Sequence, residues 1–365
     1  MDTSTVHLTR KGMVLLWMLA FIPIAIVAEH LHLNPVLVFI AAGFAIVPLA
    51  AWIANSTEGI ATVVGPSLGG LLNATFGNAT ELIVSIVALQ SGLIEVVKAS
   101  ITGTIVANLL LALGLAMLLG GARFKEQNFQ PTVARINASS LYLAVVVLLT
   151  PTAIHITSNG IQESTLIHFS IVLSILLLVF YGLMLFFSMK THSHIYQIAD
   201  EEIHEVIDPA TARAALWRQV GILLLATIAL VFVSEILVSS LEKAIETLGL
   251  TPLFIGVILI PIFGGAVEYI TAVTFSMKGK MDLAVAVAMG SSLQIAMFAA
   301  PVLVLIGQLT GHPMSLEFNA FEVLAVAVAV LITNSISNDG KSNWLEGAML
   351  LVTYAVLGAA FFFHP

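Results

Sequence analysis

The sequence contains no cysteine and very little charge. Of its 365 residues, only 9% are charged, whereas a soluble domain carries about 25%. The lack of cysteine excludes disulfides, thiol chemistry and zinc sites built on thiolates. The lack of a basic cluster argues against a nucleic-acid partner. Hydrophobic residues make up 59% of the chain, and its mean hydropathy is +1.05. Most of the chain is therefore expected to lie in a lipid bilayer.

Long apolar runs dominate the rest of the sequence. A membrane-spanning helix needs about 20 apolar residues, and eleven runs meet that requirement, at 13–31, 36–55, 67–91, 94–119, 133–154, 163–188, 216–238, 252–277, 282–308, 319–336 and 343–363. Short segments with turn residues, such as Asn34-Pro35 and Asp339-Gly340, separate them. We therefore expect an all-α polytopic membrane protein with eleven transmembrane helices. The first run fits a cleaved signal peptide only weakly, and we interpret it as a retained span.

The lysines and arginines predict the orientation of the chain, because cytoplasmic loops carry an excess of them. When the N-terminus is placed in the cytoplasm, only Lys243 is expected outside. Lys98 falls within the fourth span, where it has no assigned partner and can snorkel to the outer surface. The C-terminus is outside in this orientation, and we expect a bacterial inner-membrane protein. With the N-terminus in the cytoplasm, eleven of the thirteen lie inside: Arg10, Lys11, Arg123, Lys125, Arg135, Lys190, Arg213, Arg218, Lys278, Lys280 and Lys341.

An internal repeat divides the chain into two halves. When the sequence is aligned with itself, 66–118 matches 253–305 without a gap, and the identical positions include several glycines and one carboxylate, Glu81 with Glu268. Each half holds five spans, so the second must be inverted relative to the first, as in many secondary transporters. We therefore expect a leading helix at 1–34, a first five-helix repeat at 35–188 and a second, inverted five-helix repeat at 216–365.

The longest polar stretch, 189–215, lies between the two repeats. We expect it on the cytoplasmic side, with a short amphipathic helix. Two interpretations remain open, a solvated linker and a regulatory segment that senses cations. Its acidic residues are Asp200, Glu201, Glu202, Glu205 and Asp208.

Glu81 and Glu268 each lie about midway through a span. A charged side chain at the bilayer centre costs about 2.5–3.5 kcal/mol, and inverted symmetry should bring the two carboxylates together near the middle of the membrane. Neighbouring carboxylates repel each other, so such a pair binds protons, and a divalent cation can replace them. One Ca²⁺ or two protons would each cancel the charge of two carboxylates. Competition between Ca²⁺ and H⁺ for one site is what an antiporter requires.

Neutral oxygen ligands accompany the two glutamates in the sequence. Ca²⁺ binds about six to eight oxygens, including backbone and amide carbonyls, and glycines beside the glutamates can open the helices and expose such carbonyls. The absence of histidine and thiolate here favours Ca²⁺ over copper or zinc. For the amides, interhelical hydrogen bonding is an alternative role, and for the glycines, close packing. The candidate cation- and proton-binding residues are Glu81, Glu268, Asn78, Asn108, Ser291, Gln294, Gly77, Gly264 and Gly265.

Four further acidic residues are expected near the ends of the spans. Inversion places Glu58 and Asp282 near the cytoplasmic mouth, and Glu95 and Glu242 near the outer mouth. Each mouth would then hold one acid from each half, which suits groups that attract cations. The alternative is that they are helix-end acids at the water interface.

Four segments carry distinctive motifs: "GLLNATFGNATELIVSIVAL" at 70–89, "PIFGGAVEYITAV" at 261–273, "GSSLQIAMFAAP" at 290–301 and "DGKSNWLEGAMLLVTYAVLGAAFFFHP" at 339–365. These segments resemble the calcium/proton exchanger (CAX) family of the cation/Ca²⁺ exchanger superfamily. The resemblance implies eleven spans, a central Ca²⁺ site and alternating access driven by a proton gradient. It also implies an acidic helix at 200–208, and cation coordination by Glu81 and Glu268 with help from Asn78, Asn108, Ser291 and Gln294.

The chain departs from this family's usual pattern in both halves. Gly265 and Tyr269 stand where the family usually has Asn and His, and Ala107 stands where it often has Ser. Side-chain oxygens are therefore missing, and a proton-relay role for a histidine does not carry over. Weaker affinity, altered ion choice and backbone carbonyls as substitutes all remain open.

The sequence thus predicts a Ca²⁺/H⁺ antiporter without a resident cofactor, whose partners are Ca²⁺, protons and the bilayer. A homo-oligomer is left open, and the alternative function is a Na⁺-driven or broader-specificity divalent cation exchanger. A cation channel is disfavoured, because channels usually build acidic rings from oligomeric symmetry. An enzyme is not expected either. Gly65-Pro66-Ser67-Leu68-Gly69 matches G-x-S-x-G, but no histidine lies nearby in the sequence to pair with Ser67.

Overall fold

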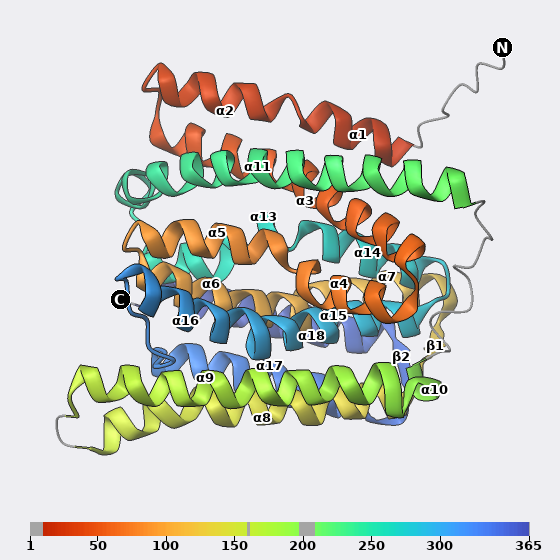
Figure 1. Ribbon diagram of the computed structural model, residues 1–365. Helices are drawn as coiled ribbons and strands as arrows, with labels where there is room; N and C mark the ends of the chain where they lie inside the picture. Colours follow the sequence, from red (N-terminus) through yellow and green to blue (C-terminus); the bar gives the residue numbers. More distant parts are fainter. Residues whose placement is uncertain (1–9, 159–160, 197–208, 365) are drawn as a thin grey trace, which may run out of the picture.

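The computed structural model describes residues 10–158, 161–196 and 209–364, and it is almost entirely helical (Figure 1). The acidic residues predicted to be regulatory, Asp200, Glu201, Glu202, Glu205 and Asp208, lie outside the described residues.

The first half of the chain forms α1 (Arg10–Met18), α2 (Phe21–His30), α3 (Pro35–Val64), α4 (Pro66–Phe76), α5 (Ala79–Gln90), α6 (Ile94–Val106), η1 (Ala107–Ala112), α7 (Leu113–Phe124), β1 (Glu126–Asn128), α8 (Pro131–Thr157), α9 (Glu163–Phe186), η2 (Phe187–Thr191) and α10 (Ser193–Tyr196). Proline occupies the first position of α3, α4 and α8, where its missing N–H costs nothing. Before α3, Asn34 Oδ1 accepts the N–H of Val36 and caps the helix.

The second half forms α11 (Pro209–Leu248), α12 (Pro252–Phe254), η4 (Ile255–Leu259), α13 (Ile260–Gly264), α14 (Ala266–Met277), α15 (Met281–Gln294), η5 (Ile295–Ala299), α16 (Ala300–Thr310), α17 (Ala320–Ile336), η6 (Ser337–Asp339), β2 (Lys341–Asn343) and α18 (Trp344–Phe363). Capping boxes begin the last two long helices, with Asn319 and Glu322 at α17 and Asn343 and Glu346 at α18.

The predicted all-α membrane fold is confirmed. Within the described residues, nine helices or continuous helical runs are long and apolar enough to cross a membrane. Two further spans are broken: α4–α5 bends by 41°, and α12–α14 bends by 58°. Counting each bent pair as one span gives up to eleven. The interrupted spans are the two that contain Glu81 and Glu268.

The helices lie side by side, so their connections gather at two ends of the bundle (Figure 1). At one end, here called the strand end, β1 pairs antiparallel with β2, with Gln127 opposite Ser342. The Arg123 guanidinium also donates to the Met277 carbonyl oxygen at 3.0 Å, which brings the ends of α7 and α14 together there. The C-terminus lies at the opposite end, here called the far end. α4 begins at the strand end and α12 at the far end, as an inverted repeat requires (Figure 1).

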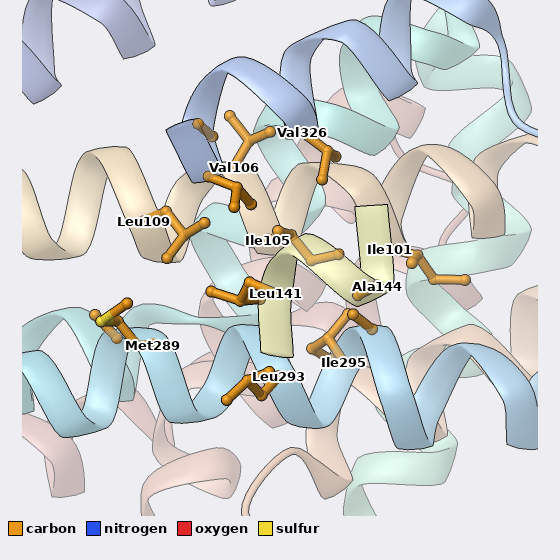
Figure 2. Close-up of a cluster of buried hydrophobic side chains, with 14 of the residues drawn as sticks. Ile101, Ile105, Val106, Leu109, Leu141, Ala144, Met289, Leu293, Ile295 and Val326 are labelled. Carbon is orange, nitrogen blue, oxygen red and sulfur yellow. The ribbon is translucent and has the colours of Figure 1, made fainter. Parts of the chain in front are cut away.

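A buried apolar cluster fills the centre of the bundle, and Figure 2 shows part of it. The cluster includes Ile105 of α6, Leu109 of η1, and Met289 and Leu293 of α15, with Leu141 of α8 between the side chains of α6 and α15 in this view. Lipid is as apolar as these side chains, so van der Waals packing holds this centre together. The helices beside the two breaks are therefore held on a common core built from both halves.

Candidate cation-binding site

Glu81 and Glu268 occupy equivalent places, each in the first turn of a helix that begins at a break. α5 begins after Asn78 and α14 begins after Gly265. Both preceding residues leave the helical conformation, with φ/ψ of −117°/34° at Asn78 and −84°/8° at Gly265. The start of a helix carries the positive end of its dipole, which stabilises a nearby carboxylate. The breaks therefore lower the cost of placing two acids inside the bundle.

Glu81 is buried and Glu268 is half-buried, and three of their four carboxylate oxygens are buried without a hydrogen-bond donor among the described residues. Glu81 is 6% exposed, and neither of its carboxylate oxygens has a donor among the described residues. The same holds for Oε2 of Glu268 and Oδ1 of Asn108. Glu81 also lies close enough to Glu268 for their charges to repel each other. Buried acceptors normally have a partner, so four acceptors without a donor point to a site that takes protons or a cation.

A chain of hydrogen bonds orients the neutral side chains beside the carboxylates. Asn108 Nδ2 donates to Ser291 Oγ at 2.9 Å, and the Ser291 hydroxyl donates to Asn78 Oδ1 at 2.6 Å. Asn78 Nδ2 in turn donates to Gln294 Oε1 at 2.6 Å. The structure thus brings the four predicted neutral residues together from both halves. Within the described residues no group of three or more His, Asp or Glu could hold a metal ion, so a cation here would depend on such neutral oxygens.

Two π-helical segments flank this chain of hydrogen bonds. η1 contains Asn108, and η5 begins directly after Gln294. The alignment of the two halves places η1 on 294–299, which nearly coincides with η5. A π-helical turn is rare and often occurs at a functional site. The repeat therefore extends to irregular backbone on both sides of the polar chain, a feature that the sequence did not predict.

Two cavities adjoin the carboxylates, and they differ greatly in size. A cavity of about 300 Å³ is lined by Asn73, Phe76, Gly77, Glu268, Thr271, Val287 and Ser291, among others. A cavity of about 10 Å³ is lined by Ile260, Phe263, Gly264, Glu81, Val84, Ser100 and Thr104, among others. In the alignment of the two halves, each residue of the first set falls on the corresponding residue of the second. The large cavity, here called the vestibule, also borders Phe275 and Leu283, near the strand-end termini of α14 and α15.

The four acids predicted at the mouths have different surroundings. Glu58 is exposed, next to Thr57, which lines the vestibule. Asp282 lies at the same end, but its carboxylate accepts the backbone N–H of Gln130 at the start of α8. Glu95 and Glu242 are both exposed, toward the far end. Of the two acids predicted for the cytoplasmic mouth, Glu58 is thus the one next to a vestibule residue in the chain.

Lys98 has a partner that the sequence left unassigned. Its Nζ lies 3.6 Å from Oε1 of Glu95, one helical turn earlier, and the Lys98 side chain is only 11% exposed. The ammonium thus reaches toward the beginning of α6, where the Glu95 side chain is 78% exposed, and its snorkelling to the outer surface stays a prediction. Glu95, expected to attract cations, has a positive charge beside it.

Sequence reasoning also missed a buried acid, Glu322. It is 1% exposed, its Oε1 accepts the Thr102 hydroxyl at 2.9 Å, and its Oε2 accepts the Asn319 N–H at 2.9 Å. The spacing Asn319-x-x-Glu322 is a capping-box pattern, which could have identified its second bond. The first bond joins α6 to α17 and has no signature in the sequence.

Comparisons with known proteins agree with this architecture. The model of the sodium/calcium exchanger protein family matches residues 34–190 and 218–363. A Ca(2+)/H(+) antiporter of Aphanothece halophytica is 56% identical over 98% of this chain and 98% of that protein, and one of Synechocystis sp. is 53% identical over 98% and 99%. The solved structure of native YfkE is 36% identical, covers 96% of this chain and 100% of that chain, and has a TM-score of 0.83. This multi-pass membrane protein therefore belongs to the sodium/calcium exchanger family, as its resemblance to calcium/proton exchangers predicted.

Proposed function

We propose that this protein is a Ca²⁺/H⁺ antiporter whose site is the pair Glu81 and Glu268. The observation that carries the proposal is the set of buried acceptors without donors, three carboxylate oxygens and Oδ1 of Asn108. One Ca²⁺ supplies two positive charges to this set, and two protons supply the same charge. Because both ligands neutralise the same two groups, binding of one releases the other. Relatives with the printed name Ca(2+)/H(+) antiporter, 53–56% identical along nearly the whole chain, support the same pair of ions.

The chain of hydrogen bonds beside the carboxylates positions neutral side chains for a hard cation. Ca²⁺ needs about six to eight oxygens, and the two carboxylates can provide up to four. Asn108 Oδ1 adds a fifth, and water from the vestibule can complete the shell. Asn78 holds Ser291 and Gln294 in place through hydrogen bonds, so these side chains do not have to be ordered when the ion arrives. Such preorganisation raises affinity without adding contacts.

Alternating access would use the two cavities in turn. The vestibule connects Glu268 with the strand end, whereas the small cavity beside Glu81 is closed. The equivalent glycines Gly103 and Gly290 also differ in how closely their surroundings are packed. A Cβ added at Gly103 would collide with the backbone of Val257, while a Cβ added at Gly290 would meet nothing within 4 Å. We infer that exchanging these two packing states opens the far end and closes the vestibule.

The strand end is the cytoplasmic end in this proposal. The basic residues of the connections between α7 and α8 and between α14 and α15 lie there, as does Lys341 of β2, and cytoplasmic loops carry such an excess. The N-terminus would then be cytoplasmic and the C-terminus outside, in a bacterial inner membrane. Ca²⁺ would load from the cytoplasm through the vestibule and leave at the far end, and protons would return.

The test is transport by purified protein in liposomes. A pH gradient should drive uptake of radioactive calcium, and Glu81→Gln and Glu268→Gln should each abolish it, because one remaining carboxylate cannot hold Ca²⁺ and two protons alternately. Glu246→Gln, at an exposed position of α11, is the matched control and should transport normally. Robust uptake by either site variant would overturn the assignment of the site. Uptake driven by a sodium gradient instead would show that Na⁺, and not H⁺, is the coupling ion.

A further inference from the structure

Each helix break has a tyrosine hydroxyl bound to the same backbone position. Tyr181 Oη donates to the carbonyl oxygen of Ala74 at 3.0 Å, and Tyr269 Oη donates to that of Pro261 at 2.8 Å. Ala74 aligns with Pro261 when the two halves are superposed in sequence, so the two acceptors are equivalent in the repeat. The tyrosines themselves are not equivalent, since Leu82 is the counterpart of Tyr269.

The accepting carbonyls lie in the last turn before each break. The last four carbonyls of a helix lose their usual partners when the helix ends. The Pro261 carbonyl still accepts the Gly265 N–H at 2.8 Å, so the Tyr269 hydroxyl is its second donor. Tyr181 is 5% exposed and Tyr269 is 8% exposed, so both hydroxyls act away from water. The two halves thus have the same type of hydrogen bond at equivalent carbonyls, although the two tyrosines come from different helices, α9 and α14.

The two bonds differ in what they connect. Tyr269 belongs to α14, so its bond closes the α13–α14 break within a single span. Tyr181 belongs to α9, and its ring packs on Phe298 of η5 with centroids 5.7 Å apart. Its bond therefore ties the α4–α5 break to neighbouring helices. Because Phe76 and Gly77 at this break line the vestibule, closing the vestibule would move the break relative to α9.

Tyr269 also explains the glycine at the second break. A Cβ added at Gly265 would lie 2.6 Å from Tyr269 Oη and 2.7 Å from Tyr269 Cζ. The first half has Asn78 at the equivalent position and Leu82 opposite it. An asparagine at 265 is therefore incompatible with the tyrosine ring in this position. The two halves thus differ in a coupled pair of residues, Asn78 with Leu82 in the first and Gly265 with Tyr269 in the second.

We propose that Tyr269 and Tyr181 are positioning residues for cation exchange, with separate tasks. Tyr269 holds the α13–α14 break, and with it Glu268, in the geometry that binds the cation in every state. Tyr181 holds the α4–α5 break only while the vestibule is open. This inference rests on the proposed exchange of Ca²⁺ for protons at Glu81 and Glu268.

The experiment compares Tyr269→Phe, Tyr181→Phe and wild-type protein in liposomes, with the Ca²⁺ concentration varied on either side of the membrane. Losing one buried hydrogen bond should change an equilibrium about fivefold. Tyr269→Phe should raise the KM for Ca²⁺ about fivefold from both sides. Tyr181→Phe should raise KM on the vestibule side and lower it on the other side, because it destabilises one state only. Tyr142→Phe, which removes a hydroxyl bound to Asn334 away from the site, is the matched control.

A rescue experiment separates positioning from loss of folding. Gly265→Asn should be nearly inactive, and Gly265→Asn combined with Tyr269→Leu should recover part of the transport, because it copies the first-half pair. The inference is overturned if both tyrosine variants keep wild-type KM values on both sides, if they only lower the amount of folded protein, or if Gly265→Asn alone is fully active. If wild-type protein shows no proton-driven uptake, the proposed function fails instead.

Discussion

The vestibule beside Glu268 and the closed cavity beside Glu81 are lined by equivalent residues of the two halves, yet one measures about 300 Å³ and the other about 10 Å³. Three of the seven matched positions carry the same residue, a glutamate, a phenylalanine and a glycine, and four carry different ones. Helix packing differs in the same direction. Near the closed cavity, α6 contacts η4 through Gly103 and Gly256, whereas Gly290 of α15 has open space beside it. A repeated sequence can therefore hold two different packings at once, which is what a protein with two alternative openings needs.

The largest expected effect comes from blocking one packing at a time. Gly103→Ala overpacks the closed side, which costs about 1–3 kcal/mol and should shift the population about fivefold or more toward the state with the vestibule closed. Gly290→Ala has space in the present state and should favour the open vestibule. Because the chain has no cysteine, Ala286→Cys in the vestibule can report on access. Labelling by a membrane-impermeant thiol reagent should fall with Gly103→Ala and hold or rise with Gly290→Ala. Equal labelling of both variants would show that the packing at Gly103 and Gly290 does not control access to the vestibule.

A smaller effect is expected from the bond between Thr102 and Glu322. Thr102→Val removes the donor to a buried carboxylate oxygen, and leaving such an oxygen without a donor costs about 1–3 kcal/mol. The thermal midpoint of the purified protein should fall, while transport at moderate temperature persists. Thr310→Val is the control, because that exposed hydroxyl bonds only to its own helix, at Ile306. An unchanged midpoint for Thr102→Val would mean that this contact does not help to hold α6 on α17.

The smallest effect is expected at the strand end, where Lys341 Nζ lies 2.9 Å from Oε1 of Glu126. Glu126 raises the pKa of Lys341, so the pair stabilises the folded state at neutral pH and loses that contribution only as the pH rises through the raised value. Both side chains are exposed, and exposed pairs contribute little. Lys341→Met should therefore leave the thermal midpoint at pH 7 unchanged within error. A clear drop would show that the strand end is held more by charge than by strand pairing.

Much of the site could be anticipated because the repeat acts as internal evidence. Glu81 alone was one acid in an apolar run, and the alignment of the two halves gave it a partner in Glu268. Polar residues on neighbouring spans are rare enough in this chain that Asn108, Ser291 and Gln294 stood out. The structure brings them together with Asn78, while their roles in transport remain proposals.

Other contacts could not be anticipated, because they join segments without a shared periodicity. Nothing in the sequence pairs Asp282 with the Gln130 N–H, or Tyr181 with the Ala74 carbonyl, since a backbone group carries no mark of its partner. The unequal cavities were also hidden, because equivalent sequences predict equal surroundings. The contact of Lys98 with Glu95 is different, because the two residues lie one helical turn apart and this spacing alone is enough to predict it.

The pairing of β1 with β2 has a consequence for how the chain is made. Glu126 and Lys341 are 215 residues apart, and Gln127 also bonds to Ser276, 149 residues further on. During synthesis, β1 leaves the ribosome long before α14 and α18 exist. Contacts between such distant residues form late. The strand end of the first repeat therefore lacks these contacts in the membrane until α14 and β2 have been synthesised.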